Sequence, residues 1–295
     1  MWPCSPLPYI PPSFPGEMLS SWLRRIAAEY SLDLRHLTAH FGLSVSQAWE
    51  IDRRLLADDV QRVAVVLRSD AAEIRRMVHP ARIRILHPTS APLQVCSPCR
   101  MGHRVATRHP VAIRAWFEYW QIECEHCRMP FSPLGAAKLT RCNPAREEPV
   151  WFESILPAAR AGARLLADFA QRPFIAGFSP VTILRLLSMR FDAIQFANTP
   201  TALHSAAEHF ATRRLAELFV PGLSKRWSDD LLPEPWTAAR PVRSPTARAI
   251  LLAAMATFLG HRDAAVDLLQ SASAYVRHPD FRPLLLSLSA SAGRS

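Results

Sequence analysis

Two pairs of cysteines constrain this 295-residue chain more than any other feature of its sequence. Cys96 and Cys99 form one C-x2-C pair, and Cys124 and Cys127 form a second pair after a gap of 24 residues. Two residues between cysteines let both thiolates reach one ion, and two such pairs supply the four ligands of a tetrahedral zinc. The spacing therefore predicts one Zn²⁺ ion in a small zinc-ribbon module with short β-strands, one of them over residues 116–122.

The chemistry of this site is predicted to be structural. Four protein ligands leave the ion no open position for a catalytic water, so its expected role is to hold a module too small for a sufficient core. Two other residues stay open as ligands, namely His126 beside Cys127 and the isolated Cys142. A pair of redox-active C-x-x-C motifs is the competing interpretation.

The region before the cysteines is predicted to be helical. A proline-rich lead occupies residues 1–16, and apolar residues at helical spacing follow over residues 17–30. A second helix is predicted over residues 32–41 with Ser31 as its cap, and a third over residues 45–56 with Ser44 as its cap. Two more are predicted over residues 59–67 and 71–78.

Gly42 separates the second and third of these helices, which is the pattern of a helix-turn-helix. If the third helix reads DNA, its outward residues are those at its start. These are Ser44, Ser46, Gln47 and Glu50. The helix has no arginine before Arg53, however, and this favours a structural or protein-docking role over base reading.

Beyond residue 149 the sequence predicts an all-helical domain. Ser179, Thr199 and Ser244 each precede a proline, which places a capping residue before a proline at the first helical position. Helices are predicted over residues 181–189, 201–219, 246–259, 263–275 and 281–289. The chain is thus expected to be mainly α, with a lead (1–16), a helix-turn-helix-like domain (17–79), a zinc-ribbon module (80–148) and a helical C-terminal domain (149–295).

The charge of the chain indicates a polyanionic partner. Lysine and arginine number 35 against 25 acidic residues, a net charge of +10, and no acid occurs between Glu73 and Glu118. This acid-free stretch surrounds the first cysteine pair and predicts a surface for nucleic acid or another acidic partner; with nucleic acid, its arginines would contact phosphates. The arginines expected to make those contacts are Arg82, Arg84, Arg100, Arg104 and Arg108.

The sequence does not predict an enzyme. No H-E-x-x-H, G-x-S-x-G or phosphate-binding P-loop motif is present, and the pairs Glu147-Glu148 and Asp229-Asp230 lie in polar loops. The start of the chain lacks the pattern of a signal peptide, and the longest apolar run is shorter than the roughly 20 residues of a membrane span. We therefore expect a cytoplasmic protein without a membrane segment.

A longer motif joins the lead to the first helix. Residues 11–27 read PPSFPGEMLSSWLRRIA, in which a proline-rich lead precedes the acidic Glu17, followed by Ser-Trp-Leu and Arg25. Farther along the chain, Trp116 stands eight residues before Cys124. In both motifs, and in their order, residues 8–135 resemble proteins of the TniQ/TnsD family.

Two departures from the family pattern accompany this resemblance. The family usually has a histidine where this chain has Cys127, and Phe131 stands in place of the leucine that normally follows. A second pair of metal ligands is usual downstream, whereas here only Cys142 remains. The resemblance therefore implies one metal site and leaves the second in doubt.

The resemblance implies a non-enzymatic accessory protein of DNA transposition. Such proteins select an attachment site, or dock on a DNA-bound, RNA-guided complex, and recruit an AAA+ ATPase regulator and the transposase. DNA, that ATPase and a second copy of the chain are thus the expected partners. A zinc-containing helix-turn-helix transcriptional regulator is the alternative function, and a zinc-dependent nucleic-acid enzyme is a third.

Overall fold

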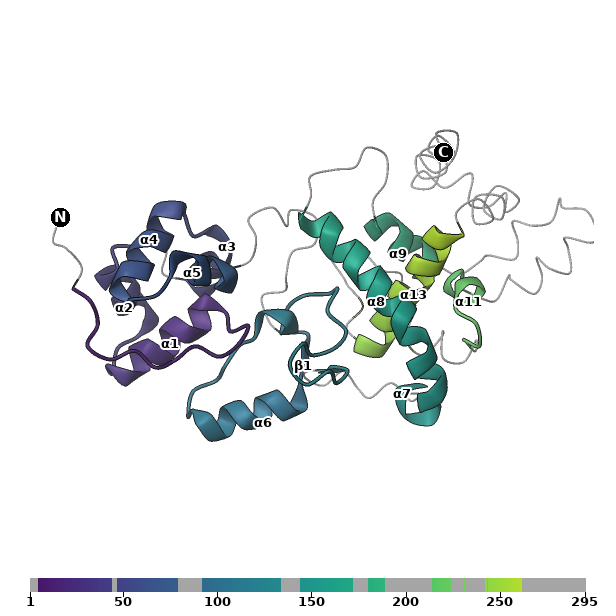
Figure 1. The fold of residues 1–295 in the computed structure, drawn as a ribbon, viewed down its shortest axis with the longest axis horizontal. Coiled ribbons are helices and arrows are strands. Elements are labelled where there is room, and N and C mark those ends of the chain that lie inside the picture. Colours follow the sequence, from purple (N-terminus) through teal and green to yellow (C-terminus); the bar gives the residue numbers. More distant parts are fainter. Residues whose placement is uncertain are drawn as a thin grey trace, which may run out of the picture. The chain divides into compact units, whose positions relative to one another are not determined.

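A computed structural model describes residues 5–43, 47–78, 92–133, 144–171, 180–188, 214–223, 231, 242 and 244–261. The chain divides into two compact units, Met1–Ser132 (unit 1) and Pro133–Ser295 (unit 2). Helices dominate both units, and the strands among the described residues are two short ones (Figure 1). The mainly α class predicted from the sequence is therefore confirmed.

Unit 1 begins with a bundle built around its first helix. The helices of this bundle are α1 (Leu19–Glu29), α2 (Leu34–His40), α3 (Ala48–Arg54), α4 (Ala57–Val66) and α5 (Ala71–Met77). Trp22, Leu23 and Ile26 recur on one face of α1 and are buried in the core, where Phe41 and Ile51 meet them. The 3.6-residue period of apolar side chains in residues 17–30 thus correctly predicted this helix.

The start of the second helix corrects a prediction. Ser31 does not cap it, because Ser31 has a φ of 54° and lies in the left-handed region. Asp33 is the cap instead, and its carboxylate accepts a hydrogen bond from the His36 N–H at 2.8 Å. Serine and aspartate are both common N-cap residues, and here Asp33, which directly precedes Leu34, occupies the cap position. Helix α3 begins at Ala48, and Ser44 lies outside the described residues.

The side chain of Asp52 on α3 caps the start of α1 by hydrogen bonds to Ser20. Its carboxylate accepts the Ser20 N–H at 2.9 Å and the Ser20 hydroxyl at 2.6 Å, so it satisfies a free amide in the first turn of α1. Burial raises the pKa of Asp52 to about 6, although the hydrogen bonds from Ser20 and the charges of Arg24 and Arg53 oppose this change.

This raised pKa predicts a pH-dependent stability. Between pH 4 and pH 6 the folded chain holds the Asp52 proton more tightly than the unfolded chain does, so Asp52 stabilises the fold at low pH and this contribution falls as the pH rises. Relative to the Asp52→Asn variant, the wild-type free energy of unfolding should fall by on the order of 3 kcal/mol across this window. Urea titrations of both proteins at several pH values measure this difference in the free energy of unfolding. A difference between wild type and variant that stays constant with pH would contradict the raised pKa of Asp52.

The second part of unit 1 is the cysteine module, residues 92–132. Strand β1 (Gln94–Val95) pairs with β2 (Ser132–Pro133), and between them lie α6 (Ser97–Ala106) and the 3-10 turn η1 (Arg114–Trp116). The module therefore contains short strands, but neither lies where the sequence predicted one. Helix α6 was not predicted, although Pro98 stands in its first turn, where proline is favoured.

The strand predicted over residues 116–122 is absent, and this prediction is wrong. The segment continues from η1 into turns in which consecutive side chains are buried, Trp116, Phe117, Tyr119 and Trp120 among them. Its carbonyls are satisfied by a side chain, because the amide of Gln94 donates to the oxygens of Ala115, Glu118 and Gln121 at 2.8, 3.2 and 2.8 Å. A buried amide therefore takes the place of a strand ladder.

Unit 2 is built on two long helices that lie side by side, α8 (Pro149–Gln171) and α13 (Pro245–Gly260) (Figure 1). Its other helices among the described residues are α7 (Pro144–Glu147), α9 (Pro180–Ser188) and α11 (Ala216–Phe219). The predicted cap is confirmed at Ser244, whose hydroxyl accepts the Ala247 N–H at 3.3 Å. Of the helix predicted over residues 201–219 only the end is described, and those over 263–275 and 281–289 lie outside the described residues.

Gly162 allows α8 and α13 to approach each other. A Cβ at this position would meet the Leu252 carbonyl closer than such atoms approach in proteins. We expect Gly162→Ala to force the helices apart and to lower the free energy of unfolding by about 1–3 kcal/mol, the usual cost of overpacking. Gly260→Ala is the matched control, since a Cβ there meets nothing within 4 Å. Equal stability of the two variants in denaturant titrations would contradict this packing.

No helix in the described part of the chain combines the length and apolar character that crossing a bilayer requires.

Candidate metal centre and adjoining basic surface

The four cysteines of the predicted site come from two turns of the cysteine module. Cys96 is the N-cap residue of α6 and Cys99 lies in its first turn, so the helix start sets the spacing of this pair. The second pair lies in a tight turn, in which the Cys124 carbonyl accepts the Arg128 N–H and the Cys124 N–H donates to the Met129 carbonyl, both at 2.8 Å. Residues 96, 99, 124 and 127 are thereby brought together.

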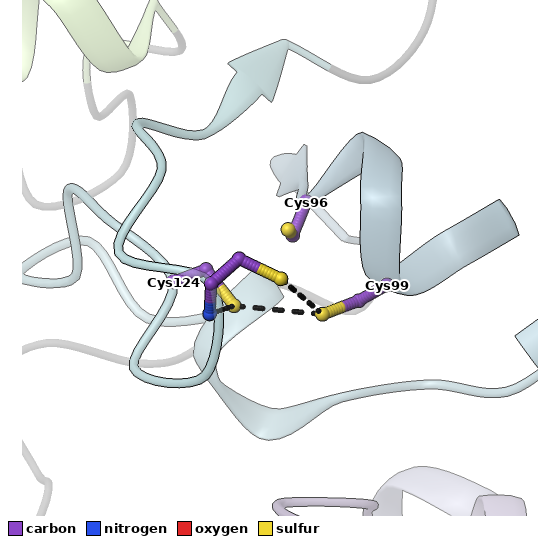
Figure 2. A group of neighbouring side chains, drawn as sticks. Cys96, Cys99 and Cys124 are labelled. Carbon is purple, nitrogen blue, oxygen red and sulfur yellow. Dashed lines mark hydrogen bonds between the residues drawn. The ribbon is translucent and has the colours of Figure 1, made fainter. Parts of the chain in front are cut away.

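The spacing of the sulfur atoms fits one metal ion. All four Sγ atoms lie within 4.8 Å of one another, with 3.3 Å between Cys99 and Cys127 and 3.6 Å between Cys99 and Cys124 (Figure 2). Four thiolates about 2.3 Å from a tetrahedral zinc lie about 3.8 Å apart. The cluster therefore has the size that such an ion requires. His126 is not part of it, and Cys142 lies outside the described residues.

The surroundings of the thiols shift their pKa values in both directions. Burial raises the pKa of Cys96 to about 11, with the Cys124 and Cys127 thiols adding to this, and burial together with the neighbouring thiols also raises the pKa of Cys99. Burial acts to raise the pKa of Cys124 too, but the N–H groups of Cys127 and His126 outweigh it and hold this pKa below its ordinary value. A bound cation would favour the thiolate at all of these positions.

A cavity of about 570 Å³ adjoins the cysteines. Its walls include Cys99, Cys124 and Cys127 on one side and the apolar side chains of Phe14, Ile113, Trp116 and Phe131. The imidazole of His103 on α6 also borders it, 4.6 Å from the Phe14 ring between centroids. The lead therefore forms part of the surroundings of the metal centre.

The residues of the motif in the lead and α1 form one buried network. Arg25 donates through Nε and Nη2 to the two oxygens of Glu17, at 2.9 and 2.7 Å, and both side chains are almost fully buried. Glu17 also accepts the Phe14 N–H at 3.0 Å and the Ser21 hydroxyl at 2.9 Å. Through these bonds Glu17 connects Phe14 of the lead to Ser21 and Arg25 of α1. The separate residues of the sequence motif therefore form one hydrogen-bonded network.

Trp22 and Ser21 extend this network to the lead and to the cysteine module. The indole N–H of Trp22 donates to the Pro11 carbonyl at 2.7 Å, and the Ser21 hydroxyl accepts the Ala112 N–H at 2.9 Å. Beside them the Met18 N–H donates to the Ala112 carbonyl, and the Arg114 N–H donates to the Gly16 carbonyl, both at 2.9 Å. The helical bundle and the cysteine module are thus joined by the backbone of the motif itself.

A protein-family model matches this part of the chain. The match covers residues 8–128, which include the lead, the buried Glu17–Arg25 pair and all four cysteines, and the family is TniQ. The chain therefore contains a TniQ domain over these residues. No curated protein and no solved structure matches the chain. The resemblance drawn from the sequence is therefore confirmed.

The TniQ domain makes this chain a transposition-associated protein. Because the family match ends at residue 128, all the elements of unit 2 lie outside it.

The TniQ domain places three of the five predicted arginines around one hollow. Arg100, Arg104 and Arg108 line a depression of about 300 Å³ at the end of α6, together with Thr107 and His109. Among the described residues, none of these three arginines pairs with a carboxylate. Arg82 and Arg84 lie outside the described residues.

The residues predicted for the outward face of the third helix are only partly described. Gln47 is exposed at the start of α3 and Glu50 is half-buried, whereas Ser44 and Ser46 lie outside the described residues. An aromatic side chain not assigned to that face, Trp49, is 39% exposed, and its indole N–H donates to the Gln47 side chain at 2.5 Å. Its exposure follows from its position two residues before the buried Ile51.

Proposed function

We propose that this chain is a non-enzymatic accessory protein of DNA transposition that selects or docks on the target site and recruits the AAA+ ATPase regulator and the transposase. The observation that carries the proposal is the TniQ domain over residues 8–128. The basic hollow at the end of α6 supports contact with DNA or with a DNA-bound complex, RNA-guided or not. A second copy of the chain is a further candidate partner.

We further propose that the four cysteines hold one structural Zn²⁺ ion. The donor set of four thiolates and the size of the cluster both support zinc. When bound, the ion would connect the start of α6 to the turn at residues 124–127. Its contribution is to fix that helix against the cavity wall, where Cys99, Gly102 and His103 face inward.

The ATPase partnership is tested by co-purification. The tagged chain is expressed with an AAA+ ATPase from a transposition gene cluster of the same genome, and a tagged unrelated zinc protein is the control. Retention of the ATPase by the tagged chain, strengthened by ATP and duplex DNA, is expected. Absence of the ATPase under all conditions, together with dimeric binding to a palindromic operator, would instead indicate a transcriptional regulator.

Contact with phosphates predicts a strong dependence of DNA affinity on salt. Each phosphate neutralised contributes a slope of about −0.9 to the plot of log affinity against log salt, so the three arginines of the hollow should contribute up to about −2.7. Fluorescence anisotropy with a labelled duplex at 50 to 200 mM NaCl measures the slope. A slope near zero would show that the chain reaches its target through protein contacts alone.

A further inference from the structure

Helix α6 has one face toward the metal centre and one face without a partner. None of its ten residues is buried. Cys99, Gly102 and His103 border the cavity beside the cysteines, and this side is the inner face. The other side carries Met101 and Val105, whose side chains are 62% and 84% exposed. Cys96 and Cys99 hold the start of α6 at the metal centre and so orient the helix. Its outer face, which carries Met101 and Val105, is covered by no described residue.

The outer face combines two kinds of side chain. Met101 and Val105 stand one turn apart, and Arg100 and Arg104 form the adjacent row, also one turn apart. Arg108 follows just beyond the helix, and all three arginines border the same hollow. The acid-free stretch between Glu73 and Glu118 contains the whole helix. A ligand for this face must therefore offer negative charge beside apolar surface.

Duplex DNA offers both in one place. The major groove is about 12 Å wide and admits an α-helix, its floor presents base edges and thymine methyl groups, and its walls are phosphates. A helix of ten residues is about 15 Å long, enough to lie in the groove across several base pairs. Three arginines line one hollow, and none of them pairs with a carboxylate among the described residues. They are therefore able to bind a phosphate at the wall of the groove.

Helix α3 fits this role less well. Glu50 stands in its first turn, and Asp52 is buried and committed to Ser20 of α1. An acid near the start of a helix in the groove would face phosphates of the same charge. The exposed face of α6 has no such residue.

We propose that α6 is a DNA-reading helix whose outer face enters the major groove, with Met101 and Val105 against the base edges and Arg100, Arg104 and Arg108 on the adjacent phosphates. The inference rests on the proposed function and assigns base reading to the cysteine module in place of the helix-turn-helix-like bundle. The metal centre then has a stated purpose, because it sets the angle at which α6 leaves the module.

Selection from a pool of duplexes with a randomised core tests this assignment. The metal-loaded full chain is compared with the double variant Met101→Ala/Val105→Ala, and Leu56→Ala/Val65→Ala is the matched control because both of its side chains are 64% exposed in the bundle. Metal content and melting temperature verify that each variant folds. We expect the double variant to lose about 5- to 100-fold discrimination at one or more positions, while affinity for unselected duplex stays within about twofold.

The arginines give a second readout. Arg100→Ala and Arg104→Ala should each reduce the salt slope by about one and weaken all sequences alike, whereas Arg164→Ala on α8 should not. The base-reading assignment is overturned if the wild-type chain selects no sequence, or if its selected sequence survives the double variant and is lost with Gln47→Ala. If the ATPase is retained but no duplex binds, this inference fails and the proposed function stands. If neither binds, both fail.

Discussion

Replacing Cys99 by serine is expected to release the metal and to unfold the cysteine module. The Cys99 sulfur lies 3.3 Å from that of Cys127 and 3.6 Å from that of Cys124, so its loss removes one of the four ligands at the point where the two turns meet. Structural zinc contributes about 10–16 kcal/mol of apparent binding free energy in small peptides, which exceeds the total stability of many domains. Metal analysis should fall from one zinc per chain to nearly none.

The unfolding itself has an optical signature. Trp116 and Trp120 are buried in the cysteine module, at 5% and 6% exposure, and they should become exposed, with a red shift of the tryptophan emission and rapid proteolysis between residues 92 and 132. Chelation of the wild-type chain should give the same result. Cys142→Ser is the control that should keep both metal and fold. A folded wild-type chain that purifies without zinc would refute the assignment.

The variant Arg25→Ala is expected to cost about 3–5 kcal/mol of unfolding free energy, because it leaves the Glu17 carboxylate buried without its counter-charge. Arg25 also donates to the Pro12 carbonyl at 2.7 Å and its guanidinium lies 4.6 Å from the Phe14 ring centroid, so the lead should detach from α1. Denaturant titration measures the loss of stability, and proteolysis near residue 12 detects the released lead.

Two controls separate the buried charge from a general effect of the change. Arg24→Ala removes the exposed neighbouring arginine and should change the stability by less than about 0.5 kcal/mol. The double variant Glu17→Gln/Arg25→Met leaves no unpaired charge and should lose less stability than Arg25→Ala alone. An Arg25→Ala chain within about 1 kcal/mol of the wild type would show that the pair behaves as a surface salt bridge.

Local patterns in the sequence predicted the elements that local physics determines. The apolar period of Leu19, Trp22 and Ile26 gave α1, and Ser244 before Pro245 gave the start of α13. The C-x2-C spacing placed four cysteines at one site, because a turn with two intervening residues brings its thiols together wherever it lies in the fold. These features require no knowledge of distant contacts.

The remaining features depend on contacts across the chain. Helix α6 has no buried residue, and its apolar side chains Met101 and Val105 are exposed, so they do not mark a core-facing stripe in the sequence. Residues 116–122 resemble a strand in composition, but carbonyls of this region accept hydrogen bonds from the side-chain amide of Gln94, more than twenty residues away. The pairing of residues 16–18 with 112–114 spans nearly the whole TniQ domain and has no local signal.

The motif that joins the lead to α1 was only partly predictable from the local sequence. Glu17 and Arg25 are eight residues apart, which is the separation of two helical turns, but Glu17 precedes α1 and reaches Arg25 through the turn at Phe14. Their spacing could indicate an interaction without showing that it is buried. The pair is buried by residues distant from each other in the sequence. Phe14 and Pro12 of the lead contact Arg25, and Ile113 of the cysteine module pairs with the backbone of Glu17.

The most direct test of the central claim, that this chain directs transposition to its target, is a map of insertion sites. Junctions between the mobile element and the genome are sequenced in cells that lack this gene and in cells complemented with the wild type or with Cys99→Ser. The account predicts that insertions at the preferred site disappear without the gene, return with the wild type and do not return with Cys99→Ser. An unchanged number and distribution of insertions in the cells that lack the gene would contradict it.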